Sequence, residues 1–500
     1  MNTAGGDTFK ILLDCVEKGQ NRYNDNQTSI FMVPSMLRDL SQGSFEPRLV
    51  SIGPLHSEHK NVQQSSGLKE SYLHDLFHNF DFSDSMREQA LKDCMEKVNT
   101  SINQIKASYS VMKSPVSDDE LAKMMVLDGC FILEFCYKHF KNYKVCLPNM
   151  MQNVCIAIDL ILVENQIPFF VLQDLFDCTL KKHVTISLTK MLYTVLAEYL
   201  HPFYYPIPET ADSVPDVATD STYDHILGLF HRRYKLPQTN PSEETKPPLQ
   251  SEETETQVHS AIDLDRSGVK FMPHQNETFP MTIEFKPSLF TYFPFYWGKP
   301  TLFLPKLVID DYSEPVFRNF IAYEQSVPRV HYHFTSYAYA MDKLVDTQED
   351  VTRLVKSKVI VNRLGSDEEA ANLINRLCRN ISLVDYCYTQ RFKEVHDYYS
   401  GYWPKNVARL RRTYFSSPWN AIALFAGIIL FSLTVVQTVI SILAIMADQR
   451  NDEDEHNRQN EEEEPIFNED SMDISDQIRR ALEKYTPVLL KRLNQTLEGR

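Results

Sequence analysis

The segment Ser117–Phe140 reads SDDELAKMMVLDGCFILEFCYKHF. Its first four residues have the form of a capping box, in which a serine and a glutamate side chain bond the free N–H groups at the start of a helix. From Leu121 an apolar run continues to Phe140, as expected for a helix that follows such a start. The segment therefore predicts a long helix with a largely apolar surface.

Helical periodicity also occurs before and after this segment. An apolar stripe with three- and four-residue steps comprises Leu91, Cys94, Val98, Ile102, Ile105 and Tyr109. Residues 151–163 predict a third helix, which should end near Pro168 because proline disfavours helical geometry in the residue before it. The helical period returns from Glu314, and Ser366-Asp-Glu-Glu369 is a second capping box.

Three short segments predict strands instead: 269–271, 281–285 and 301–304, two of which alternate apolar and polar residues. The predicted fold class is mainly α (α+β). We expect a large helical domain with a small β element, followed by one C-terminal transmembrane helix.

The transmembrane prediction rests on Ala421–Met446, 26 consecutive residues without a charge. As a helix the segment is about 39 Å long at 1.5 Å per residue, which exceeds the ~30 Å hydrocarbon core of a bilayer. The alternative is a buried helix of a soluble core, but such helices seldom run so far without a charge. The sequence thus predicts a single-pass protein that has the membrane as a partner.

Flanking charges predict the orientation of this segment. Four cations precede it, Lys405, Arg409, Arg411 and Arg412, whereas only Arg450 and Arg458 follow closely. Cations favour the cytoplasmic side, so we expect a cytosolic N-terminal domain and a translocated tail, in the plasma membrane or an endomembrane. Asn494-Gln-Thr496 is a glycosylation sequon beyond the segment, and sequons at Asn99 and Asn276 precede it.

Glycine spacing and net charge exclude several classes of function. The 14 glycines of the 500 residues include no pair four or five positions apart. The glycine-dependent motifs of ordinary kinases, P-loop NTPases, dinucleotide oxidoreductases and α/β-hydrolases are therefore absent. A net charge of −16 argues against a broad nucleic-acid surface.

The nine cysteines show no C-x-x-C spacing and no paired Cys/His ligands. Several lie in apolar runs, where an unpaired cysteine acts as a small hydrophobe. Residues 1–10 lack a basic region followed by an apolar one, so we expect no signal peptide. Reduced thiols in the cytosol, with no metal and no cofactor, are the simplest interpretation.

Polar segments divide the rest of the chain. Residues 1–27 predict a flexible N-terminus, and Pro-, Ser-, Glu- and Thr-rich residues at about 206–258 predict a disordered insert, interrupted by a short packed helix at 223–234. Residues 447–500 form an acidic tail, in which 451–464 should be solvated and disordered. An apolar stripe over 474–497 is compatible with docking on a partner, with lying on a membrane, or with no role.

Several motifs of the folded part are long and unusual. In the first half they are Ile30-Phe-Met-Val-Pro34, Phe45-Glu-Pro-Arg-Leu-Val-Ser-Ile-Gly-Pro54 with His56, Leu127-Asp-Gly-Cys-Phe-Ile-Leu-Glu134, Asp159, and Glu164-Asn-Gln-Ile-Pro-Phe-Phe170. In the second half they are Ala261, Gly268-Val269 with Phe271, Arg318-Asn319 with Ala322 and Glu324, Asp346-Thr-Gln-Glu-Asp-Val351, and Tyr414-Phe-Ser-Ser-Pro-Trp419. Together, over roughly 28–445, they resemble the plant domain-of-unknown-function 247 family. Phe45 stands where an aromatic residue, often tyrosine, is usual, and the long acidic tail is atypical.

The resemblance implies a single-pass membrane protein of a land plant, with a family domain over 28–415, and no established catalytic activity. Some grass relatives resemble male-side determinants of self-incompatibility, which act in recognition between pollen and stigma. That role belongs to particular members of the family.

The most conspicuous polar cluster is Glu164-Asn165-Gln166, which lies between two apolar runs. In a catalytic interpretation, Glu164 is a buried acid or base that works with Asp128 or Asp159. In a structural interpretation, these side chains bond backbone groups left free where Pro168 ends the preceding helix. We favour the structural interpretation.

Three other candidates have structural interpretations that we also favour. His331 and His333 could lie on one face of a strand as metal ligands, although no acid or cysteine completes the set nearby. Asp310-Asp311 is typical of a turn or a helix start. The aromatic segment Phe290–Trp297 could face a membrane or a ligand, but core packing is the simpler role.

The predicted function is that of a membrane-anchored, non-enzymatic module for protein interaction, signalling or recognition, with an unidentified protein partner. An enzyme of unfamiliar type with a buried carboxylate at Glu164 is the alternative. No catalytic, cofactor-binding or metal-binding residue is assigned.

Overall fold

The structure is a computed structural model. It describes residues 9–10, 12–16, 28–58, 62–78, 84–110, 116–141, 149–200, 223–234, 258–274, 279–287, 299–384, 386–401 and 418–460, together with Pro404, Asn406 and Arg409. Most of the predicted flexible N-terminus and of the predicted insert, the aromatic segment Phe290–Trp297 and the tail beyond Asn460 lie outside the described residues.

The chain divides into two compact units, Met1–Thr413 and Tyr414–Arg500. The helices in the first half of the first unit are α2 (Ser35–Arg38), the 3-10 helix η1 (Gln42–Ser44), α3 (Val62–His78), α4 (Asp84–Thr100), α5 (Ile102–Ala107), α6 (Asp118–Lys141), α7 (Met150–Asp159), α8 (Phe169–Cys178), α9 (Leu188–Leu196) and α10 (Ile226–Arg233).

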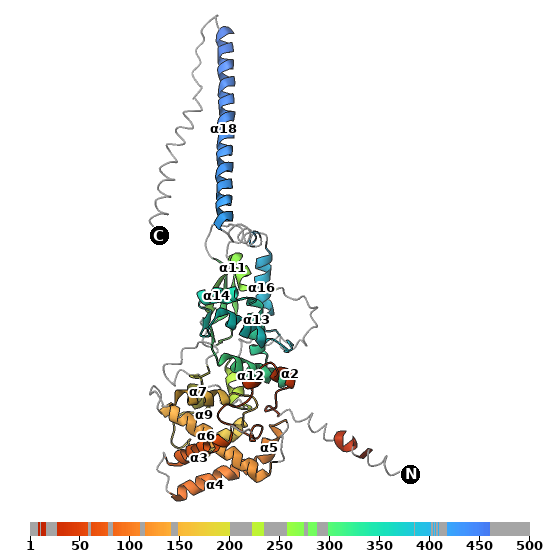
Figure 1. Cartoon of the computed structure of the whole chain (residues 1–500), viewed down its shortest axis with the longest axis vertical. Helices are drawn as coiled ribbons and strands as arrows, with labels where there is room; N and C mark the ends of the chain where they lie inside the picture. The colour runs from red at the N-terminus through yellow and green to blue at the C-terminus, as the bar shows by residue number, and fades with distance from the viewer. Residues whose placement is uncertain are drawn as a thin grey trace. The chain divides into compact units, whose positions relative to one another are not determined.

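The second half of this unit mixes helices and strands. Its helices are α11 (Ala261–Arg266), α12 (Ser313–Ser326), α13 (His333–Leu344), α14 (Gln348–Lys356), α15 (Asp367–Leu377) and α16 (Thr389–Ser400), and its strands are β1 (Lys270–His274), β2 (Glu284–Lys286), β3 (Thr301–Pro305), β4 (Leu307–Ile309) and β5 (Ile360–Asn362). The two halves gather at opposite ends of the unit, with α12 between them (Figure 1).

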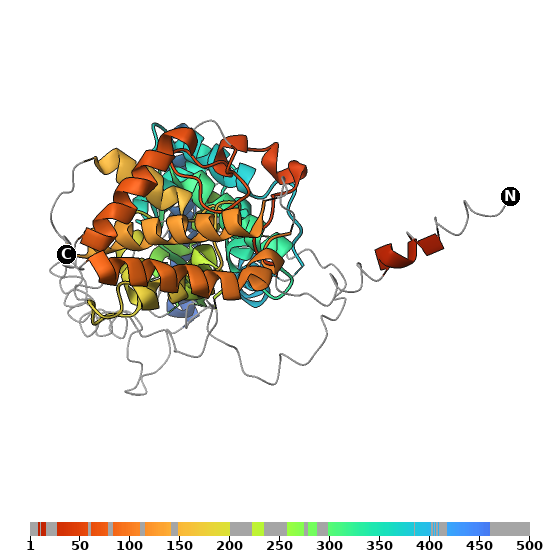
Figure 2. The ribbon, with the colours of Figure 1, turned by 90° about the horizontal axis from the view of Figure 1, so that it is seen from below.

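The segment Ser117–Phe140 forms the central helix α6 of the first half, as predicted. The backbone N–H of Glu120 donates to Ser117 Oγ at 3.2 Å, and the N–H of Ser117 donates to Glu120 Oε2 at 3.1 Å, which completes the capping box. α6 packs against α3, α4, α8 and α9, and Figure 2 shows the orange helices of this group side by side. Most residues of α6 are therefore buried.

Two helix boundaries differ from the prediction. The apolar stripe from Leu91 to Tyr109 is shared by α4 and α5, with a break at Ser101, although Cys94, Val98 and Ile105 are buried as expected. The third predicted helix, α7, ends at Asp159 and not near Pro168. It ends early because polar side chains further along the chain bond the carbonyl groups at its end, as described below.

The three predicted strand segments form one sheet with the order β1-β3-β2. β1 and β3 are parallel, with Phe271 opposite Leu302, and β2 pairs with β3 antiparallel. A second, two-stranded parallel sheet of β4 and β5 was not predicted. At the second predicted capping box, Ser366 Oγ accepts the N–H of Glu369 at the start of α15, which is the N-cap half of that motif.

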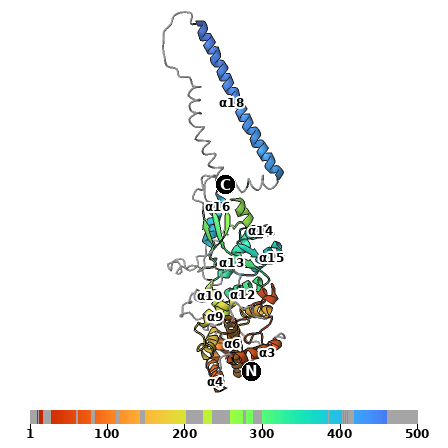
Figure 3. The same ribbon diagram turned by 90° about the vertical axis from the view of Figure 1, so that its left-hand side faces the viewer.

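The second unit contains α18 (Pro418–Asn460), a single continuous helix (Figure 3). Within it, Ile422–Ala447 is by length and composition apolar enough to cross a membrane, with a mean hydropathy of 2.5. The predicted fold class is therefore confirmed: mainly helical, with a small sheet and one C-terminal apolar helix. The expectation of disorder from residue 451 is wrong as far as Asn460, because extending an existing helix costs little once it has nucleated.

Candidate functional site

Residues 28–58, hereafter the N-terminal segment, contain little regular structure but are held in the core of the first unit. Asp159, at the end of α7, accepts the backbone N–H groups of three consecutive residues: Arg48 at 2.9 Å, Leu49 at 2.8 Å and Val50 at 2.9 Å. Burial raises the pKa of the Asp159 carboxyl to about 6, although the three donors oppose the shift. This carboxylate supplies acceptors to a stretch of backbone that has no strand or helix partner.

Glu164 holds two other parts of the same segment. Its Oε1 accepts the N–H of Val33 at 2.6 Å and is also bonded by Arg38, while its Oε2 lies 2.8 Å from Nε2 of His56. The Glu164 side chain is completely buried. Both oxygens of the proposed catalytic carboxylate are thus occupied by groups of the protein itself.

The neighbouring amides bond the backbone where α7 ends. Asn165 Nδ2 donates to the carbonyl groups of Asp159 at 2.8 Å and Val50 at 3.0 Å, and Gln166 Nε2 donates to those of Leu160 and Leu162. This is the arrangement that the structural interpretation of the cluster expects, and it ends α7 several residues before Pro168.

Asp128 on α6 is a third buried carboxylate that bonds the N-terminal segment. It accepts the N–H of Gly53 at 2.8 Å and pairs with Lys69 of α3. Burial raises the pKa of the Asp128 carboxyl, and the Lys69 ammonium opposes that shift. Asp128, Asp159 and Glu164 form these bonds with different residues, so the bonds do not bring Glu164 together with either aspartate as the catalytic interpretation required.

Asn319 of α12 joins the two halves of the unit. Its Oδ1 accepts the N–H of Val163 at 2.9 Å, and its Nδ2 donates to the carbonyl of Ser44 at 2.6 Å. The sequence singled out Asn319 only as part of a motif, without a role. These two partners are far away in the chain, so no local signal could have revealed them.

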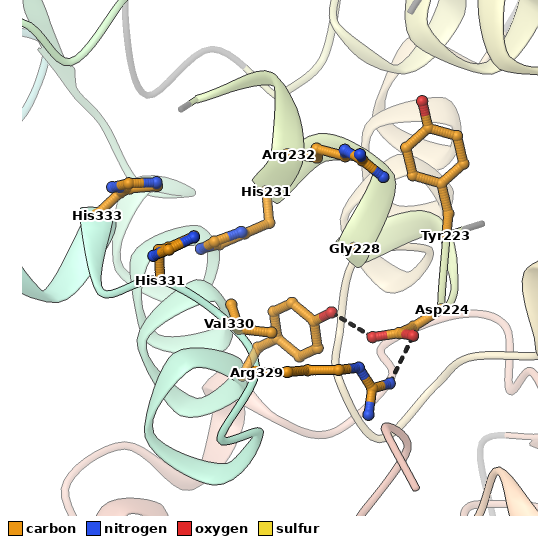
Figure 4. Close-up of a pocket in the computed structure, with 10 residues that line it drawn as sticks. Tyr223, Asp224, Gly228, His231, Arg232, Arg329, Val330, His331 and His333 are labelled. Atoms are coloured by element: carbon orange, nitrogen blue, oxygen red, sulfur yellow. Dashed lines mark hydrogen bonds and ion pairs between the residues drawn. The ribbon is translucent and has the colours of Figure 1, made fainter. Parts of the chain in front are cut away.

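A polar pocket lies between α10 and the connection from α12 to α13 (Figure 4), with a volume of about 230 Å³. Its lining residues are Tyr223, Asp224, Gly228, His231, Arg232, Tyr323, Arg329, Val330, His331 and His333. Asp224 is the acidic residue in this lining, and it accepts from Arg329 Nη2 and from the hydroxyl of Tyr323, both at 2.6 Å. The lining therefore contains two arginines, three histidines and one carboxylate, although the chain as a whole has a net charge of −16.

A buried glutamate behind the pocket fixes one of its walls. Glu324 accepts the N–H groups of Phe334 at 2.8 Å and Thr335 at 2.7 Å, which caps the start of α13. His231 Nε2 donates to the same carboxylate at 2.6 Å. The His231 ring is thereby held in place at the pocket.

His331 and His333 lie close together, but at the start of α13 and not on a strand. Their ring centres are 5.5 Å apart, and the rings of His231 and His333 are 5.9 Å apart. Among the described residues no group of three or more His, Cys, Asp or Glu side chains is placed to hold a metal ion. The stacked imidazoles are a wall of the polar pocket in this structure.

Asp310 forms a turn directly before a helix, one of the two roles predicted for Asp310-Asp311. Its Oδ1 accepts the N–H of Tyr312 at 3.1 Å and the hydroxyl of Ser313 at 2.9 Å, directly at the start of α12. The sequence did not single out the other acids and bases of the pocket, His231, Arg232, Arg329 and Asp224. The one signal near them was the apolar content of residues 223–234, which correctly predicts the packed helix α10.

These features define a class of protein: a mainly helical domain whose N-terminal segment is held by buried polar side chains, followed by one long apolar helix. Residues 30–433 match the family DUF247, described as a plant protein of unknown function, and the chain belongs to this family. It is 28% identical to the UPF0481 protein At3g47200 of Arabidopsis thaliana, over 84% of this chain and 87% of that one. It is 24% identical to the putative UPF0481 protein At3g02645 of the same plant, over 82% and 89%. No solved structure matches the chain.

Proposed function

We propose that this protein is a membrane-anchored, non-enzymatic module whose N-terminal domain binds another protein in signalling or recognition. The hydrogen bonds of Glu164 are the observation that favours binding over catalysis. A general acid or base must exchange a proton with a substrate within hydrogen-bond reach. Glu164 is buried, both of its oxygens accept bonds from Val33, Arg38 and His56, and it does not line the polar pocket.

The uncharged part of α18 supports the anchor. Among the described residues, Ile422–Ala447 presents exposed large apolar side chains, and water would penalise such a surface. We propose a single crossing with the domain in the cytosol, in the plasma membrane or an endomembrane. Recognition between cells, the role that the family resemblance implies for some grass members, would instead require the domain outside.

Membrane flotation of the full chain tests the anchor. The wild type should float with vesicles after extraction at alkaline pH, whereas a variant with Leu433→Lys and Val436→Lys should remain in the dense fractions. Each lysine near the centre of a span costs about 2.5–3.5 kcal/mol. Release of the wild type by alkaline extraction would contradict an integral anchor.

Photocrosslinking tests the interaction. The full chain carries a photoreactive phenylalanine analogue at Val330, which lines the polar pocket, or at the exposed Glu88 of α4 as the control position. We expect one discrete protein adduct in native membranes from position 330 and none from position 88. The same set of adducts from both positions, or no adduct at all, would contradict specific binding at this face.

The alternative enzyme predicts a different result for Glu164→Gln. This substitution preserves the shape of the side chain but removes its charge. If Glu164 acts on a substrate, an assayed turnover should fall by orders of magnitude while the domain stays folded. If the protein is a binding module as proposed, Glu164→Gln lowers the stability of the domain. The yield of the partner adduct then falls only in proportion to the fraction of the protein that remains folded.

A further inference from the structure

The polar pocket has a local charge opposite to that of the chain. Arg232 and Arg329 contribute two cations and Asp224 one carboxylate, which pairs with Arg329 and accepts from Tyr323, so one cation is in excess. A recess with an excess of one sign of charge concentrates ligands of the other sign. In a chain with a net charge of −16, such a recess selects an anion.

Of the two arginines of the lining, Arg232 is the one that is not paired with Asp224. It makes no ion pair with an acid in the described part of the chain, and its guanidinium lies 5.6 Å from the centre of the Tyr223 ring. The side chain is half-buried, on the same helix as His231. Stacking on a ring orients a guanidinium while leaving its N–H donors available in the plane.

Side chains with N–H groups lie on several sides of the polar pocket. Figure 4 shows the guanidinium groups of Arg232 and Arg329 on two different sides, and the rings of His231, His331 and His333 on a third. Glu324 positions His231 from behind, and Gly228 leaves room in the wall. One guanidinium group can bind both oxygens of a planar carboxylate, whereas a tetrahedral anion has oxygens that point in several directions and can accept from donors on several sides.

The volume limits the size of the ligand. About 230 Å³ is less than the roughly 300–1,000 Å³ of sites that enclose a drug-sized molecule or cofactor. It is sufficient for one small anionic head group. We infer that this pocket binds a phosphate group, either as the free ion or as a monoester on a side chain of the proposed protein partner.

Binding is measured on the full chain in detergent, by the rise in unfolding temperature and by broadening of the ³¹P resonance. The probes are inorganic phosphate and N-acetyl-O-phosphoserine amide, with N-acetylserine amide and sulfate at equal ionic strength as controls. We expect a saturable rise with both phosphate probes, a smaller one with sulfate and none with the uncharged amide. Tighter binding of the phosphoserine probe identifies a phosphorylated partner as the source, and tighter binding of inorganic phosphate identifies the free ion.

Two variants and a matched control place the effect in the pocket. Arg232→Gln should weaken phosphate binding about tenfold, equivalent to ~1.4 kcal/mol, while Arg391→Gln, an exposed arginine on α16, should leave it unchanged. Asp224→Asn removes the carboxylate of the lining and should tighten binding, which provides a second readout if Arg232→Gln folds poorly. No saturable effect in the wild type, an equal effect of sulfate, or equal affinities of the Arg232→Gln and Arg391→Gln variants would overturn the inference.

The phosphorylated-partner form of this inference rests on the proposed function, but the two fail separately. Phosphate binding that depends on Arg232, without any adduct from position 330, would refute the protein partner and retain the site. An adduct without phosphate binding would refute the site and retain the partner.

Discussion

Asn165 and Ile52 lie 113 positions apart in the chain, and the Oδ1 atom of Asn165 accepts the N–H of Ile52 at 2.6 Å. The Nδ2 group of the same side chain donates to the carbonyl groups of Val50 and Asp159. One buried amide therefore joins the N-terminal segment to the end of α7. Burial would otherwise leave the N–H of Ile52 and the carbonyl of Val50 without partners, whereas the carbonyl of Asp159 also accepts the N–H of Leu162 at 3.4 Å.

Replacing Asn165 by leucine should destabilise the domain strongly. Asn165→Leu retains a similar volume but leaves the N–H of Ile52 and the carbonyl of Val50 unpaired, at about 1–3 kcal/mol each, while the carbonyl of Asp159 keeps the N–H of Leu162 at 3.4 Å. We expect the free energy of unfolding to fall by about 2 kcal/mol or more in urea denaturation of the full chain in detergent. Gln89→Leu, at an exposed position of α4, is the control and should change it by less than about 0.5 kcal/mol. Equal effects of the two substitutions would show that the buried amide does not hold the segment.

Adding a methyl group at two glycines should change stability in opposite directions. Gly53 has a φ of 73°, and a Cβ there would lie 2.6 Å from the carbonyl oxygen of Gln166. Gly53→Ala should therefore destabilise the domain by more than ~1 kcal/mol. Gly67 lies inside α3 with open space around it, so Gly67→Ala should stabilise by about 0.5–1 kcal/mol. Thermal unfolding of both variants measures the difference, and a shared sign would refute this account of Gly53.

His225 should make stability depend on pH between about 4 and 6.5. Its Nδ1 accepts the N–H of Gly228 at 3.1 Å and caps α10, while Nε2 donates to the carbonyl of Ser29 at 3.2 Å, so the geometry requires the neutral ring. Burial lowers the pKa of His225 to about 4. The unfolded chain binds a proton near pH 6.5 and the folded one only near pH 4, so the stability is fully present above pH 6.5 and is lost as the pH falls toward 4.

The full loss amounts to about 3 kcal/mol for a shift of this size. Because other carboxylates and histidines titrate in the same range, the measurement is the difference in unfolding temperature between the wild type and His225→Asn from pH 7 to pH 4. Asparagine can cap a helix without gaining a proton. The wild type should lose stability more steeply, and parallel curves would exclude His225 as the source.

Glycosylation should report the orientation of the membrane helix. If the domain is cytosolic, only the tail meets the glycosylation machinery, so a glycosidase-sensitive mobility shift of the full chain should vanish in Asn494→Gln. Asn99→Gln, at an exposed position of α4, is the matched control and should leave the shift in place. A shift that survives the loss of Asn494 and vanishes with Asn99 would place the domain outside the cytosol.

The features that could be predicted from the sequence depend on residues a few positions apart. A capping box joins Ser117 to Glu120 within one helical turn. The uncharged segment Ala421–Met446 is recognised from its own composition alone, because its length and apolar character do not depend on distant residues. For the same reason the three strand segments could be recognised, two of them by their alternation, although their pairing could not. The structural interpretation of Asn165 and Gln166 also succeeded, because it invoked the end of the adjacent helix.

Only the tertiary structure showed what the buried acids hold and where the polar pocket lies. Asp159 reaches residues about 110 positions away, and Asn319 reaches Ser44 over 275. The pocket joins residues of α10, inside a polar stretch of sequence, to Arg329 and His331 about a hundred positions later. No local pattern records such pairs, because a buried donor needs only an acceptor nearby in space, wherever in the chain that acceptor lies.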